Sequence, residues 1–98
     1  MEPAKFVQKP MNRDVKEGSK VRFDAMVKGI PQPEVIWFIN EAEVVQSDKV
    51  KIESKPVRTE LSTSLVFENV TTEDSCDVRA EAKNPAGQDT CSAKLTVQ

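Results

Sequence analysis

The sequence predicts an all-β fold, a two-sheet antiparallel sandwich. Apolar and polar residues alternate in several short segments, which is the pattern of strands that bury one face. Turn residues, chiefly glycine and proline, separate these segments at intervals of about 8–12 residues. No segment shows the apolar period of about 3.6 residues that marks an amphipathic helix. We therefore expect one small domain over residues 1–98, with its core over about 5–97.

Three strands are predicted in the first half of the chain. Residues 1–10 contain two prolines, which suit an extended edge strand and exclude a helix. Residues 21–28 alternate strictly between apolar and polar side chains. The prolines of 29–33 then interrupt the chain, because proline does not fit a central strand. Residues 34–40 form the next strand, with Trp37 on its inner face.

Four more strands are predicted in the second half. Residues 49–54 and 59–70 alternate and are separated by a short polar turn. Residues 76–83 and 89–97 alternate on either side of the turn Asn84–Gly87, which indicates a hairpin. The inner-face residues of all these strands that we expect to form the core are Val21, Phe23, Ala25, Val35, Trp37, Leu65, Phe67, Val78, Ala80, Cys91 and Leu95.

Three motifs carry a resemblance to a known family. The run GIPQPEVIW ends at Trp37, Asp74 follows the strand of residues 59–70, and NPAG occupies the last hairpin turn. Together they resemble an intermediate-set (I-set) immunoglobulin domain, over nearly the whole chain. The resemblance implies a Greek-key immunoglobulin-like sandwich. In style the sequence is similar to the intracellular modules of the muscle proteins titin, twitchin and obscurin, and to telokin, the module at the end of smooth-muscle myosin light-chain kinase.

The sequence departs from that family at three positions. The two positions of the family's inter-sheet disulfide hold Ala25 and Ala80, and the position of its corner tyrosine holds Val78. The resemblance therefore implies a sandwich without the inter-sheet disulfide. A secreted domain of this size usually keeps such a disulfide, since losing one costs about 2–5 kcal/mol. We expect a cytoplasmic protein of the sarcomere or cytoskeleton.

The two cysteines of the chain are expected to be free thiols. In a hairpin that turns at Asn84–Gly87, Cys91 pairs with Ala80, and Cys76 pairs with Leu95. Four strand residues then separate the thiols, roughly 13 Å, whereas a disulfide needs Cα atoms within about 7 Å. We expect Cys91 to face the core and Cys76, near a turn, to be the more accessible thiol.

Charge and composition exclude several classes of function. The net charge is −2, and the 14 basic residues are scattered among 16 acidic ones, which argues against nucleic-acid binding or a basic membrane-binding patch. No apolar run is long enough to span a membrane. The chain has no histidine, and its cysteines lack metal-ligand spacing. We expect no catalytic residue, no metal and no cofactor.

The turn before residue 76 carries two further signals. Asn69-Val70-Thr71 has the pattern of an N-glycosylation acceptor, but the same residues suit a tight turn, which we favour. Asp74 is expected to accept hydrogen bonds from its own turn or to pair with Arg22 or Lys51.

One surface is a candidate partner face. Ile36 and Phe38 alternate out of phase with Trp37 and therefore point away from the core, and Met26 is a candidate to join them. Scattered apolar side chains on a surface are common, so this remains a hypothesis. On the strand of residues 76–83 the outward side chains alternate in charge, which indicates a solvated face with weak cross-strand pairs.

Three hypotheses for function stay open. The leading one is a non-catalytic spacer and docking module of a giant sarcomeric or cytoskeletal protein, with neighbouring immunoglobulin or fibronectin-type domains in tandem and a sarcomeric partner. The second, which the resemblance to telokin implies, is a regulatory module attached to a muscle protein kinase. The third is a cell-surface adhesion domain, which the glycosylation pattern favours and the absent disulfide opposes.

Overall fold

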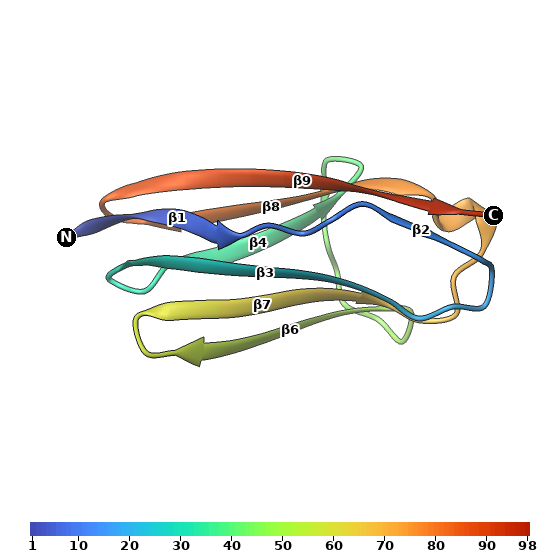
Figure 1. Ribbon diagram of the computed structural model, residues 1–98, viewed down its shortest axis with the longest axis horizontal. Coiled ribbons are helices and arrows are strands. Elements are labelled where there is room, and N and C mark those ends of the chain that lie inside the picture. The colour runs from blue at the N-terminus through green and yellow to red at the C-terminus, as the bar shows by residue number, and fades with distance from the viewer.

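Two β-sheets pack face to face in the computed structural model, which describes residues 1–98 (Figure 1). The first sheet has the strand order β1-β3-β7-β6 and the second has the order β2-β9-β8-β4-β5. The bounds are β1 (Glu2–Gln8), β2 (Arg13–Val15), β3 (Val21–Ile30), β4 (Glu34–Ile39), β5 (Ala42–Glu43), β6 (Val50–Val57), β7 (Glu60–Phe67), β8 (Cys76–Asn84) and β9 (Gly87–Val97), with a 3₁₀ turn η1 (Thr72–Asp74). The predicted fold class is thereby confirmed.

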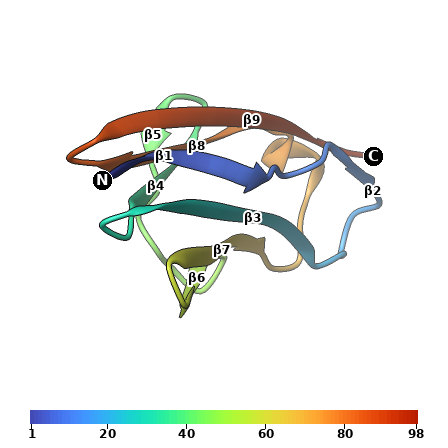
Figure 2. The ribbon, with the colours of Figure 1, turned by 60° about the vertical axis from the view of Figure 1, so that its left-hand side comes forward.

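The chain crosses between the two sheets several times, as Figure 2 shows from a second direction. The first crossing splits the N-terminal segment: β1 pairs with β3 in the first sheet, and β2 pairs with β9 in the second. The β2–β9 pair is parallel, whereas the other strand pairs are antiparallel. The two chain ends consequently lie at opposite ends of a molecule that is 44 Å long (Figure 1).

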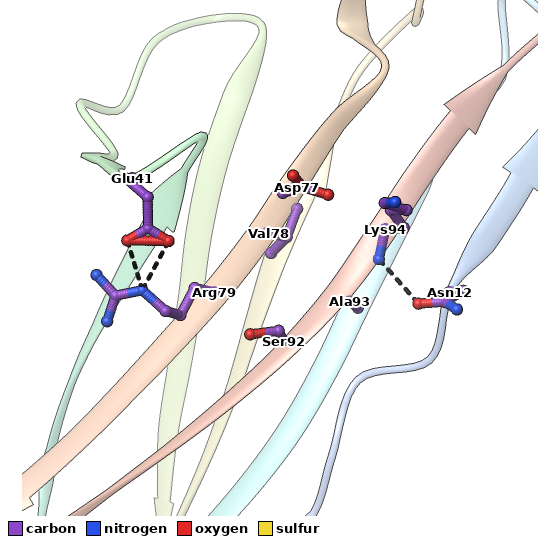
Figure 3. A pocket seen from close by; sticks show the side chains of 8 residues that line it. All are labelled: Asn12, Glu41, Asp77, Val78, Arg79, Ser92, Ala93 and Lys94. Atoms are coloured by element: carbon purple, nitrogen blue, oxygen red, sulfur yellow. Dashed lines mark hydrogen bonds and ion pairs between the residues drawn. The ribbon is translucent and has the colours of Figure 1, made fainter.

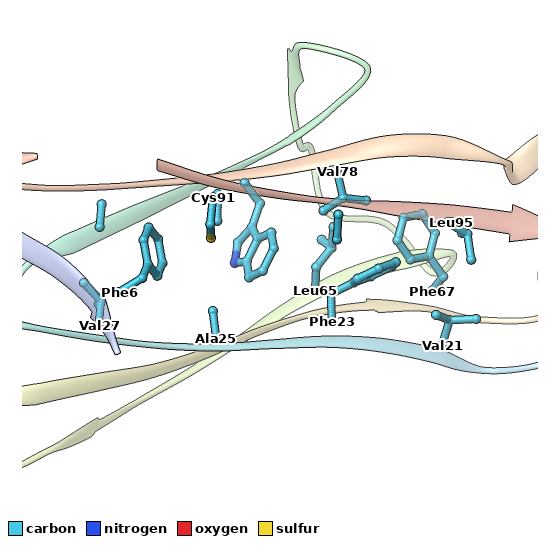
Figure 4. Packing of buried hydrophobic residues seen from close by; sticks show 14 of the residues in the cluster. Phe6, Val21, Phe23, Ala25, Val27, Leu65, Phe67, Val78, Cys91 and Leu95 are labelled. Atoms are coloured by element: carbon cyan, nitrogen blue, oxygen red, sulfur yellow. The ribbon is translucent and has the colours of Figure 1, made fainter. Parts of the chain in front are cut away.

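The core lies between the sheets and contains nearly all the residues predicted for it. Phe23 and Phe67 meet edge to face at 6.0 Å between ring centroids, toward the right-hand side of the cluster in Figure 4. The prediction was wrong for Val35, which is half-buried and packs against the rim of the core. On one side its strand, β4, pairs with β8, but on the other side it has only the two-residue β5, paired at Phe38 and Ile39, so Val35 has no strand on that side. The core also contains residues outside the predicted list, namely Ala4, Phe6, Val27, Val70, Ala82, Ala93 and Val97.

A single asparagine ties together the end of the molecule where the chain begins. Asn84 is buried at the last residue of β8. Its Oδ1 accepts three backbone N–H groups and its Nδ2 donates to two backbone carbonyls; the partners are Ala4, Ala86 and Gly87 for Oδ1, and Glu2 and Pro31 for Nδ2. One side chain thus connects β1, the β3–β4 turn and the β8–β9 turn.

The free edge of the first sheet is β6, and much of it is capped by side chains. Gln46 Oε1 accepts the N–H of Ile52 at 3.0 Å, and Ser47 Oγ accepts the N–H of Val50 at 3.2 Å. Pro56, which points the same way by the two-residue period of a strand, has no N–H. Among the β6 residues that point away from β7, Ser54 is therefore the one whose backbone N–H stays free.

Candidate interaction surface

The outward face of the second sheet is organised around Arg79 of β8. Its guanidinium lies over the ring of Phe38, 4.0 Å from the centroid, and its Nε donates to the carboxylate of Glu41 at 3.0 Å and 3.2 Å. Its Nη1 donates to Glu81 at 2.9 Å. The hydrogen bond to Glu81, together with the charge of Glu41, raises the pKa of Arg79. A planar cation stacked on a ring and hydrogen-bonded to two carboxylates has a defined orientation.

This arrangement changes the expectation for Phe38. The sequence placed it on an open apolar face, but the guanidinium covers its ring and leaves the residue half-buried. Ile36 stays 42% exposed, opposite Glu81 on β8. Met26 does not join it, since Met26 belongs to β3 on the other sheet. Ile36 is therefore the open apolar residue of the predicted partner face.

A hollow of about 350 Å³ lies beside Arg79 (Figure 3). Glu41, from the β4–β5 turn, forms one wall, and Asn12, just before β2, forms the other. Asn12 is fixed there because its Oδ1 accepts the backbone N–H of Lys94 at 2.9 Å. Ser92 and the alkyl part of Ala93 contribute to the lining, with charged side chains around them. The hollow is suited to a polar side chain of a partner.

A second feature with functional weight is the parallel pairing of β2 with the end of β9. Asp14 pairs with Thr96, and Val15 pairs with Val97. The contact continues past the strands, because Glu17 N–H donates to the carbonyl of Gln98 at 3.2 Å and Gln98 N–H donates to that of Val15 at 2.9 Å. The side chain of Gln98 adds a hydrogen bond to Asp14 at 2.8 Å. The last residues of the chain are thus fastened to the segment that follows β1.

Asp74 binds its own turn, as expected, but its cation is a different one. Its Oδ2 accepts the N–H of Thr71 at 2.7 Å and pairs with Nζ of Lys49 at 2.7 Å. The prediction of Arg22 or Lys51 as the partner was wrong, because Lys49 forms this ion pair. Arg22 instead pairs with acidic side chains of its own sheet. Lys49 precedes β6 and reaches across the end of the sandwich, which strand alternation alone does not reveal.

The pKa of Asp74 reflects two opposed effects. Burial raises this pKa, while the hydrogen bonds from Lys49 and from the N–H of Thr71 lower it and prevail.

Lys49 also donates a hydrogen bond to the carbonyl of Asn69, at 2.9 Å. Asn69 has φ of 45°, a conformation typical of asparagine in tight turns. Turn chemistry accounts for the residues of the glycosylation pattern.

Both cysteines lie on the inner side of the terminal hairpin, in the predicted register. Cys91 is opposite Ala80 and is buried, and Cys76 is opposite Leu95 and is half-buried. Both thiols are free. Burial, reinforced by neighbouring aspartates, raises the pKa of each to about 11. Neither thiol is set up as a nucleophile, since the reactive thiolate is disfavoured.

No three side chains of the histidine, cysteine, aspartate and glutamate types come together as metal ligands would. The structure contains no helix with the length and apolar character needed to cross a bilayer.

Comparison with known proteins places this geometry in a family. The family model of the immunoglobulin I-set domain matches residues 4–97. The muscle M-line assembly protein unc-89 of Caenorhabditis elegans is 35% identical over 92 residues, which are 94% of this chain and 1% of that protein. Telokin of Meleagris gallopavo is 36% identical over 93 residues, which are 95% of this chain and 58% of telokin. The chain thus spans only part of the length of these relatives.

Solved structures give the same result. The titin M3 domain superposes with a TM-score of 0.89 at 26% identity, covering 100% of this chain and 99% of that one. Titin domains Z1Z2, solved in complex with telethonin, superpose with a TM-score of 0.87 at 33% identity, covering 98% of this chain and 47% of that one. The chain therefore belongs to the immunoglobulin I-set domain family, and the proteins it is similar to are muscle proteins.

Proposed function

We propose that this chain is a non-catalytic module of a larger sarcomeric or cytoskeletal protein, in which it acts as a mechanical spacer and docking surface. The observation that carries the proposal is the parallel β2–β9 pair in a molecule whose two ends lie at opposite ends of its 44 Å axis. Tension between neighbouring domains enters at one end and leaves at the other. It therefore runs along β2 and β9 and not across the sheets.

The direction of this load determines how the hydrogen bonds resist it. The N–H···O bonds between paired strands lie roughly across the strand axis. Tension along the axis therefore shears the bonds of β2 and β9 together, including the contacts of Val15 and Glu17 with Gln98. Bonds that share a load must break together, whereas bonds at the end of a hairpin open one after another. The geometry supports a module that holds its length under tension.

The docking part of the proposal rests on the outward face of the second sheet. Ile36 is exposed there, the guanidinium of Arg79 stacks on Phe38, and a polar hollow lies beside this stack. Titin Z1Z2 is similar to this chain and was solved with telethonin bound. By analogy we propose that the partner is a sarcomeric protein. We also propose that neighbouring immunoglobulin or fibronectin-type domains flank the chain in tandem, and that the protein is cytoplasmic.

A second candidate function is a regulatory module attached to a muscle protein kinase. The observation that favours it is the match to telokin and, at 32% identity over 93 residues, to smooth-muscle myosin light chain kinase of Gallus gallus. Binding of the purified chain to a kinase domain, and a change in that domain's activity, would favour this candidate. The mechanical proposal does not require the chain to bind a kinase domain or to change its activity.

Force spectroscopy on single molecules tests the mechanical proposal. The domain is held between handle domains at its two termini, and the unfolding force of Val15→Pro is compared with that of Lys51→Pro. The first proline removes a donor from the β2–β9 pair, and the second removes one from the β6–β7 pair, outside the load path. Urea denaturation establishes how much stability each variant loses.

We expect Val15→Pro to lower the unfolding force more than Lys51→Pro for the same loss of free energy of unfolding. Equal losses of force would show that the β2–β9 pair does not bear the load.

For the docking face, capture of muscle proteins by the parent domain is compared with capture by a folded Ile36→Lys variant. A partner retained equally by both would remove this face from the proposal.

A further inference from the structure

The outward face of the first sheet carries two lysines in an unfavourable arrangement. Lys5 of β1 and Lys28 of β3 are directly opposite each other on neighbouring strands, and both are exposed. Like charges at directly opposed positions of an antiparallel pair destabilise the sheet. Neither lysine forms an ion pair, although the face contains carboxylates that form them elsewhere.

The carboxylates nearer the middle of this face are already engaged. Arg22 pairs with Asp24 at 3.5 Å and with Glu53 at 3.1 Å, and Asp24 also accepts the hydroxyl of Ser64 at 2.5 Å. Lys55 of β6, one row below Lys28, likewise lacks an ion pair. The face therefore divides into a part around Arg22, where the charges pair, and a part near the N-terminal end where Lys5, Lys28 and Lys55 form no ion pair, although Glu60 of β7 lies opposite Lys28.

Exposed apolar side chains gather at that same end. Val7 of β1, Ile30 of β3 and Val57 of β6 are 48%, 43% and 41% exposed. Val7 follows Lys5 by two residues on β1, Ile30 lies two residues beyond Lys28, and Val57 and Lys28 both pair with Glu60 of β7. Exposed apolar side chains with polar and charged groups around them are characteristic of binding sites.

We propose that this surface, the Lys5–Lys28 patch (Lys5, Val7, Lys28, Ile30, Lys55 and Val57), binds an acidic segment of another protein that also carries apolar side chains. Carboxylates of the segment would neutralise the opposed lysines, and its apolar side chains would cover Val7, Ile30 and Val57. This inference goes beyond the proposed function, since it concerns the sheet opposite Ile36 and holds whether or not the module bears load.

The charges favour a protein segment over a uniform polyanion. Glu2 and Glu60 lie within the same region, opposite Ile30 and Lys28. The whole chain has a net charge of −2. A nucleic acid or an anionic membrane would bring negative charge against these carboxylates as well as against the lysines, whereas a peptide can place its acids singly.

The test is an NMR titration of the ¹⁵N-labelled domain with a short synthetic peptide of mixed aspartate, glutamate, leucine and valine. We expect amide shifts over β1, β3 and β6, and weaker binding as salt increases. A Lys5→Glu/Lys28→Glu variant should lose about tenfold or more in affinity. The matched control is Lys83→Glu/Lys94→Glu, which makes the same charge change on the other sheet and should bind as the parent does.

Four results would overturn the proposal. One is the absence of shifts at millimolar peptide, and another is an equal loss of affinity in the control variant. The third is tighter binding of phosphatidylserine vesicles or of single-stranded DNA than of the peptide, which would assign the patch to a different class of ligand. A peptide with serine in place of its acids should not bind, and its binding would contradict the charge argument.

Discussion

The indole Nε1 of Trp37 donates a hydrogen bond of 3.0 Å to Oγ1 of Thr63, across the space between the two sheets. Trp37 belongs to β4 and pairs with Ala80, and Thr63 belongs to β7 and pairs with Ala25. Ala25 and Ala80 are the positions at which the I-set resemblance places a disulfide. A buried hydrogen bond between the neighbours of these two alanines thus links the sheets where the covalent bond is missing.

Thr63→Val is expected to destabilise the domain by about 1–3 kcal/mol, because it leaves a buried N–H without an acceptor at nearly constant volume. Thr63→Ser is the matched control, since it keeps the hydroxyl and loses only a methyl group. Urea denaturation gives both free energies of unfolding. If valine proved no worse than serine, the hydrogen bond would not contribute to the link between the sheets.

Asn84→Ala should cost at least about 2 kcal/mol, because several backbone groups lose their partner at one buried site. Asn84→Asp separates the two sides of the amide: it keeps an acceptor for the N–H groups but loses the donor to Glu2 and Pro31. Amide hydrogen exchange should show faster opening of β1 in both variants. Unchanged protection of Ala4 and its neighbours would contradict the proposed connection.

Asp74→Asn should lower stability by about 1 kcal/mol or less, as it removes the charge that pairs with the partly exposed Lys49. The folded-state pKa of Asp74 lies below its ordinary value of 3.8. Its contribution to stability is therefore present above that ordinary value and is lost as the pH falls through the folded-state pKa. The free energies of unfolding of parent and variant should differ at neutral pH, begin to approach each other below about pH 4 and converge once the pH lies below the folded-state pKa. A difference that grew in acid would have the wrong sign.

The thiols should react slowly with Ellman's reagent at neutral pH, Cys76 first and Cys91 only as the domain opens. Burial raises the pKa of both from 9.0 to about 11. The stability linked to these neutral thiols is complete below the unfolded-state pKa and is lost as the pH rises through about 11. In the Cys76→Ala variant, the slow labelling of Cys91 should be unchanged. Rapid labelling of Cys91 in the native domain would refute its burial.

Lys5→Glu should raise the free energy of unfolding by roughly 0.2–1 kcal/mol at low salt, because it turns an opposed like-charge pair into an attractive one. The gain should shrink as salt screens the exposed charges. Lys5→Gln removes the repulsion without adding attraction, so its free energy of unfolding should lie between those of the parent and of Lys5→Glu. A destabilised Lys5→Glu variant would show that Lys5 and Lys28 do not repel each other in the folded domain.

The sequence predicts most of the sandwich because two-residue alternation is a strong local signal. It identified the inner faces of β3, β8 and β9 and the register of the terminal hairpin, which follows from one tight turn. It missed β2 and β5, which have three and two residues and are too short to alternate. Both form by pairing with distant strands, and no local pattern specifies such pairing.

The candidate site was predictable only in part, for the same physical reason. Alternation correctly directs Ile36 and Phe38 away from the core, but it does not show which side chains lie above them. The stacking of Arg79 on Phe38 and the pairing of Asp74 with Lys49 join residues far apart in the chain. Such contacts depend on how sheets and turns are placed in space, so they required the structure.

The capped edge of β6 matters most after a module has opened. In the proposed tandem array, identical or similar modules are tethered at effective concentrations in the millimolar range. Strand edges with free donors are the places where one unfolded neighbour can join the sheet of another. Because Gln46 and Ser47 occupy two donors and Pro56 lacks one, this edge offers little template for such exchange. A chain that is stretched and released can then return to its own partner strands instead of to those of its neighbour.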